Sequence, residues 1–247
     1  MSPSPFPAFP VSQITIPSNP VIKAAYTYVK ENCSECTLNH VLRSTAFGLI
    51  IQKKFPPFAG IDTEAVVIST ILHDMGWATT KSLISSDKRF EVDGANIARD
   101  FIGKEGDGSQ WDKHRIQLLW DAIALHTTPS IAQYKEPEVA ATGLGVMGDF
   151  FGPNIPLPGN IITVEEYKEV VGAFPRLDFK EELKGIMCGL CREKPETTYD
   201  NFVSEYGKTY GLDGKGTGKE EFAKQCEQRN FVIGFQASLD ALAQYEN

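Results

Sequence analysis

Long apolar runs and blocks of like charge are both missing from this chain of 247 residues. No apolar stretch approaches the roughly 18 residues that a membrane-spanning helix needs, so we expect no membrane partner. The net charge is −8, and lysine and arginine are not clustered, which argues against a nucleic-acid ligand because phosphates are bound by clustered cations. Residues 1–7 lack the basic start and apolar core of a signal peptide, so we expect a cytoplasmic protein.

Cysteine is also scarce: there are five, and four of them form the C-x-x-C pairs Cys33/Cys36 and Cys188/Cys191. That spacing is compatible with a four-cysteine zinc site or a redox pair. The two pairs lie roughly 150 residues apart, much further than in a zinc ribbon. Cys191 also shares a helical stripe with apolar neighbours, so we favour buried, reduced thiols over both alternatives.

The sequence shows no strand alternation, no repeats and no interdomain linker, and apolar residues recur at helical spacing along most of it. We therefore predict an all-α fold, with an extended proline-rich segment at 1–19 and a single domain at 20–247 that includes a C-terminal helical extension. A glycine-rich stretch at 207–218 is expected to be an exposed, mobile loop. The expected helices start at Pro20 and cover 37–54, 62–76, 93–102, 112–126, 138–150, 163–171, 179–191 and 220–243.

His73-Asp74 is the most informative motif, because it follows the apolar run 66–72. An adjacent imidazole and carboxylate can bind one divalent ion if a buried helix directs them into a pocket. His40 lies upstream in a polar stretch of the helix predicted at 37–54, and Asp149 follows a glycine-punctuated apolar run. Together these residues offer two nitrogens and two carboxylates, a donor set suited to zinc or another first-row divalent metal.

The two remaining histidines, His114 and His126, are predicted to lie in different places, one on the surface and one facing inward. His126 shares a helical stripe with Leu119 and Ile123, so we expect it to face inward, either as a pocket residue or as a core histidine bonded to a backbone carbonyl. His114 lies twelve residues earlier, about 120° around the helix, and is predicted to be on the surface.

Six short motifs occur along the chain: Leu38-Asn39-His40-x-x-Arg43, Leu72-His73-Asp74, Phe90-Glu91-x-x-Gly94, Ala124-Leu125-His126, Gly148-Asp149-Phe150-x-Gly152 and Phe174-Pro175-Arg176-Leu177. As a set they resemble the HD-domain superfamily of metal-dependent hydrolases, and within it the fungal cyanamide hydratases. The resemblance covers residues 20–205 and departs from the pattern at Met75-Gly76-Trp77, at 207–218 and in a longer C-terminus.

The resemblance implies an HD-domain helical bundle in which one zinc ion, with Fe²⁺ and Mn²⁺ as alternatives, activates a water that attacks the nitrile carbon of cyanamide and yields urea. The implied metal ligands are His40, His73, Asp74 and Asp149. For catalysis, Asp74 would orient the water and His126 would bind the substrate or transfer a proton. Glu91 and Lys81 are weaker catalytic candidates.

Other functions remain open from the sequence. An HD-type phosphohydrolase acting on a nucleotide or small phosphomonoester would need cations at the site, for which Arg43, Lys81, Lys88 and Arg89 are candidates. A second alternative is a pathway-specific hydrolase or lyase with a larger pocket lined by Trp77 and residues 153–158. A third is a degenerate HD domain that binds a ligand without catalysing a reaction. The sequence lacks a dense basic cluster, which favours a small neutral substrate.

The apolar terminal helix could pack in the core or on a second subunit, so a homo-oligomer is a further expectation.

Overall fold

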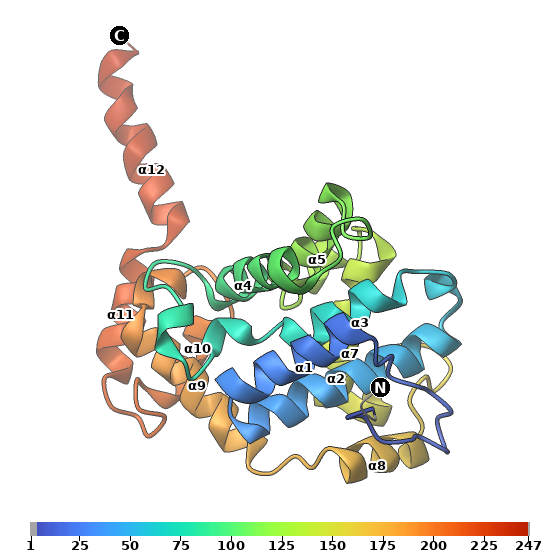
Figure 1. Cartoon of the computed structure of the whole chain (residues 1–247). Coiled ribbons are helices and arrows are strands. Elements are labelled where there is room, and N and C mark those ends of the chain that lie inside the picture. Colours follow the sequence, from blue (N-terminus) through green and yellow to red (C-terminus); the bar gives the residue numbers. More distant parts are fainter. Residues whose placement is uncertain (1–3, 247) are drawn as a thin grey trace. The chain divides into compact units, whose positions relative to one another are not determined.

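The computed structural model describes residues 4–246, and its regular secondary structure consists of helices, so the predicted all-α fold is confirmed (Figure 1). No described residue belongs to a strand; the one isolated β-bridge joins Phe9 to Ile14. None of the described helices has the length and apolarity needed to cross a membrane. The chain divides into two compact units, which are described separately.

The first unit takes in the chain up to Ser85 together with Phe90–Leu177. Its α-helices are α1 (Pro20–Asn32), α2 (Glu35–Lys54), α3 (Thr63–Leu72), α4 (Phe90–Glu105), α5 (Lys113–Ala124), α6 (Pro129–Ala132), α7 (Pro137–Phe151) and α8 (Val164–Ala173). Short 3-10 turns occur at η1 (Pro56–Phe58), η2 (Met75–Trp77), η3 (Lys81–Leu83) and η4 (Gly152–Asn154).

Local capping explains several helix starts. The Asn19 side chain accepts a hydrogen bond from Ile22 N at the start of α1, and Asp62 does the same for Ala65 N at the start of α3. Thr163 and Glu166 form a capping box at the start of α8. The largest differences from the predicted boundaries are in α3, which ends at Leu72 rather than near Gly76, and in α4, which covers Phe90–Glu105 rather than 93–102.

Helix α2 lies at the centre of this unit and is buried continuously from Cys36 to Ile51. It packs closely against α7, where a Cβ atom on Gly145 would come within 2.8 Å of Ser44 O and 3.0 Å of Gly48 Cα. Only glycine permits this approach, and it brings the polar residues of α2 next to those of α7. The N-terminal segment packs on this unit through the buried side chains of Phe6 and Phe9.

The second unit consists of Ser86–Arg89 and the chain from Asp178 onward. It contains α9 (Phe179–Glu193), η5 (Pro195–Thr197), α10 (Val203–Tyr210), α11 (Lys219–Gln228), α12 (Phe231–Leu242) and η6 (Ala243–Tyr245). The prediction of one continuous helix over 220–243 was wrong, because two helices cover this range. The first helix, α11, ends at Gln228, and the Asn230 side chain then caps a new helix by accepting from Val232 N. The loop predicted over 207–218 was wrong at its start: Gly207 is buried within α10, where a Cβ atom would lie 2.4 Å from the Phe222 ring, and the loop begins at Gly211.

Candidate metal centre

His73 and Asp74 lie where α3 ends, in the turn that leads into η2. His73 is 0% and Asp74 1% exposed. Nδ1 of His73 lies 2.8 Å from the Thr70 carbonyl, which can only accept a hydrogen bond, so this nitrogen carries the proton. Nε2 of His73 therefore presents its lone pair, 3.0 Å from Asp74 Oδ2.

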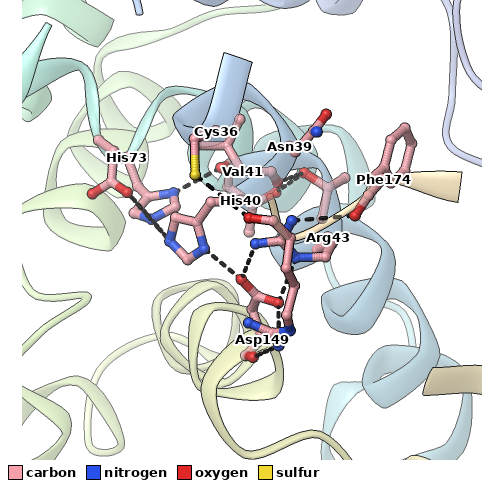
Figure 2. Close-up of polar contacts among 12 residues, drawn as sticks. Cys36, Asn39, His40, Val41, Arg43, His73, Asp149 and Phe174 are labelled. Carbon is pink, nitrogen blue, oxygen red and sulfur yellow. Dashed lines mark hydrogen bonds and ion pairs between the residues drawn. The ribbon is translucent and has the colours of Figure 1, made fainter. Parts of the chain in front are cut away.

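His40 reaches the same place from the middle of α2. Its Nε2 lies 3.3 Å from His73 Nε2 and 3.3 Å from Asp74 Oδ2. On the other side of the ring, Nδ1 donates to Asp149 Oδ2 at 2.6 Å, as Figure 2 shows. This bond fixes the tautomer and directs the Nε2 lone pair toward His73 and Asp74, which is the usual arrangement around a metal-binding histidine.

These three residues form the one group with metal-ligand spacing found among the described histidine, cysteine, aspartate and glutamate residues: one ligand atom from each of His40, His73 and Asp74 lies within 4.8 Å of the others. Both Asp74 carboxylate oxygens are buried, and neither accepts a hydrogen bond of good geometry. A buried carboxylate without such donors is costly unless a cation compensates it. The residues therefore fit a divalent ion, and two imidazole nitrogens with a carboxylate oxygen suit zinc, iron or manganese.

The electrostatics of the group agree with this interpretation. Burial raises the pKa of Asp74, but the neighbouring His73 and His40 imidazoles outweigh it and hold that pKa well below its usual range. Burial lowers the pKa of His40, but the hydrogen bond to Asp149 and the negative charges of Asp149 and Asp74 more than reverse this, so the net direction is upward. Because a metal binds the unprotonated nitrogen, a raised pKa of His40 makes metal binding weaker as the pH falls.

Asp149 lies on the far side of His40 from the other two predicted ligands. Its carboxylate accepts from His40 and from Arg43, whose Nε and Nη2 lie 2.7 and 2.9 Å from Oδ1 and Oδ2. Arg176 Nη2 also donates to Oδ1, at 2.9 Å. Burial raises the pKa of Asp149, but the bonds from His40 and Arg43 lower it far more. The structure thus shows Asp149 holding His40 in place. Ligation by Asp149 stays a prediction and would require an oxygen to exchange one of these donors for the metal.

His126 follows the end of α5 and is 5% exposed. Its Nδ1 donates to Ile123 O at 2.6 Å, and its Nε2 lies 3.8 Å from Asp74 Oδ1. The sequence allowed His126 to be either a core histidine or a pocket residue, and each alternative describes part of what is observed. His126 bonds to a backbone carbonyl, and it also faces the group formed by His40, His73 and Asp74. Burial, reinforced by the His73 imidazole, lowers the pKa of His126 to about 4, so the ring is neutral near pH 7.

The remaining predicted residues lie in different surroundings. Glu91 is buried in the first turn of α4 and accepts from Thr127 Oγ1 at 2.6 Å, next to His126 in the chain. Lys81 lies in η3 with an exposed side chain, and His114 is exposed as predicted. The catalytic roles of Glu91 and Lys81 stay predictions.

Arg176 is the main contributor that the sequence did not assign. Besides Asp149, its guanidinium reaches the Tyr167 hydroxyl, with Nε 3.1 Å away. The motif Phe174-Pro175-Arg176 was visible as part of the resemblance, but no local pattern indicates which carboxylate its arginine meets. Phe90 was missed in the same way: it packs edge-on against His126 at 5.7 Å between ring centres and stacks on Trp77.

The cysteines are free thiols, which supports the reduced alternative. Cys36 donates to Arg176 O at 3.5 Å and Cys191 to Val203 O at 3.3 Å. Burial raises the pKa of Cys191 to about 11, the opposite of what a metal-binding or redox thiol requires.

The fold is an all-α bundle whose two buried histidines and one buried aspartate could together hold a divalent metal ion. The HD domain family matches residues 37–165, which make up more than half of the chain and include all four predicted ligands, and the chain belongs to this family. HD-domain proteins are generally metal-dependent hydrolases. No curated protein sequence shows significant similarity to the chain.

Proposed function

We propose that the chain hydrates cyanamide, or a closely related small nitrile, to urea or the corresponding amide at a divalent metal site. The observation that carries the proposal is the buried group of His40, His73 and Asp74, with a neutral imidazole facing it from His126. When bound, a divalent ion supplies a water acidified enough to act as a nucleophile near neutral pH.

The chain's own residues supply orientation and proton transfer. Asp74 has two buried oxygens without well-placed donors, so one can hold the metal while the other accepts a hydrogen bond from the attacking water. His126 has its proton on Nδ1, which leaves Nε2 as an acceptor beside Asp74. In the proposed reaction the water oxygen bonds to the nitrile carbon, one C–N π bond breaks, and His126 passes the water proton to the nitrile nitrogen before tautomerisation to urea.

The environment of Arg43 favours a neutral substrate over a phosphate ester. A phosphoryl group needs cations that point at it. Arg43, the cation nearest to His40 in the sequence, is fully buried, and its guanidinium is occupied by Asp149 and by the carbonyls of Phe174 and Pro175. It therefore holds a carboxylate in place rather than facing a substrate.

The test is urea production from cyanamide by purified protein, with metal content measured on the same sample. We expect about one divalent ion per chain and fast turnover. His73→Ala should lose both metal and activity, whereas His114→Ala, which removes an exposed histidine, should lose neither. Bound metal without urea formation would refute cyanamide hydration while leaving the metal site intact, and hydrolysis of a phosphomonoester panel by that sample would favour the alternative activity.

A further inference from the structure

The last described α-helix, α12, exposes an unusual amount of apolar surface. None of the residues of α12 is buried, and its large apolar side chains are 50–66% exposed. They are Phe231, Val232, Ile233, Phe235, Leu239 and Leu242. Single exposed apolar side chains are ordinary, but a contiguous group of this size usually marks an interaction surface.

Five of these side chains share one face of the helix. With about 100° of rotation per residue, Phe231, Leu242, Phe235, Leu239 and Val232 fall within an arc of about 100°. We call these five residues the apolar stripe. An arc of this width is what a helix presents to a packing partner. Ile233 and Asp240 lie outside it, on the opposite side of the helix.

We propose that the apolar stripe pairs with the same stripe of a second copy of this chain. The stripe has residues at i, i+3, i+7 and i+10 from Val232, the spacing of a two-helix seam. Pairing α12 with α12 across a two-fold axis closes the assembly after two copies.

The area available matches a dimer. At their observed exposure, the five side chains present about 500 Å² of surface, given that an aromatic side chain buries about 150–250 Å² in total. A symmetric pair therefore buries about 1,000 Å², the size at which specific association begins.

The charges of α12 favour a second copy over other partners. Its single charged residue is Asp240, which lies off the stripe, and the helix contains no lysine or arginine. A helix that lies on an anionic lipid surface carries cations on its polar face, and α12 lacks them. A different protein partner would usually be selected by charges beside the apolar contact, and α12 has none beside the stripe. The surface that complements the stripe is therefore the same stripe on a second copy of the chain.

The test is the mass of the full-length chain in solution, measured by light scattering on a sizing column over a range of concentrations. We expect a dimer of about twice 27.3 kDa. The double variant Phe235→Asp/Leu239→Asp should run as a monomer. Ile233→Asp introduces one such charge at an exposed apolar position off the stripe, and it should remain dimeric. Circular dichroism confirms that each variant keeps its helix content.

Three results would overturn the proposal. The first is a native chain that stays monomeric at every concentration. The second is a dimer that the stripe variant leaves intact, or that Ile233→Asp disrupts equally, because either would place the interface elsewhere. The third is a monomeric native chain that binds phosphatidylcholine–phosphatidylserine vesicles through the stripe, which would make the partner a lipid surface.

Discussion

Replacing Asp149 with alanine removes the carboxylate that neutralises a fully buried arginine. Arg43 and Asp149 are both 0% exposed, and the guanidinium donates to both carboxylate oxygens. Removing one partner of a buried ion pair leaves the other charge uncompensated, at a cost of about 3–5 kcal/mol. Arg43 keeps its bonds to the carbonyls of Phe174 and Pro175 in the variant, so we expect the lower part of that range, about 3–4 kcal/mol.

Metal must be removed before this comparison, because Asp149 is also a predicted ligand and bound metal adds its own stabilisation. For a chain of this size, about 3–4 kcal/mol corresponds to a fall in melting temperature of about 6–16 °C, measured by calorimetry on both proteins in chelator. The double variant Arg43→Met/Asp149→Leu should recover most of the loss, because an apolar pair replaces a buried ionic one at little cost. A loss below about 1 kcal/mol, or a double variant no more stable than Asp149→Ala, would refute the view that this pair is buried and mutually compensated.

Three further outcomes are expected. His126→Ala should keep the metal while turnover on cyanamide falls about 10²–10⁴-fold, as for the loss of a proton-transfer group, and metal loss would instead make it a ligand. Gly76→Ala should destabilise the chain by about 1–3 kcal/mol and reduce metal binding, because its Cβ would lie 1.7 Å from Phe90 O; Gly103→Ala, with open space around it, should not. With its pKa raised to about 11, Cys191 is protonated at pH 8, so iodoacetamide should label it about 100-fold more slowly in the folded chain than in denaturant; equal rates would contradict its burial.

The parts of the fold that local chemistry determines could be predicted from the sequence. The helix caps at Asn19, at Asp62 and at the pair Thr163/Glu166 are bonds to backbone only three residues away, so both partners lie close together in the sequence. Asn230 is a capping residue of the same kind, and it precedes an apolar run. This helix start was not predicted because apolar residues recur at helical spacing across the whole of 220–243. The helical backbone is interrupted at Arg229, but the apolar spacing is not.

The site was predictable in its composition but not in its contacts. His40, His73 and Asp74 meet as expected, and adjacency in the sequence had already indicated the last two. The position of Asp149 depends on Arg176, which is 27 residues away, and on His40, which is 109 residues away. No periodicity links positions at such separations. The sequence therefore indicates which side chains could bind a metal. Only the packed helices show which side chain orients another through a hydrogen bond, as Asp149 does for His40.

The hydrogen bonds of segment 174–176 bear on how far the HD domain can be treated as a transferable module. This segment lies beyond residue 165, where the family match ends, yet its Phe174 and Pro175 carbonyls accept from Arg43 and its Arg176 side chain donates to Asp149. A polypeptide cut at 165 and grafted elsewhere would retain every predicted ligand but leave Arg43 without these acceptors. In evolutionary terms, gene fusion or recombination that preserved the site would need a breakpoint downstream of Arg176, so the heritable unit of this metal centre is longer than the motif that identifies it.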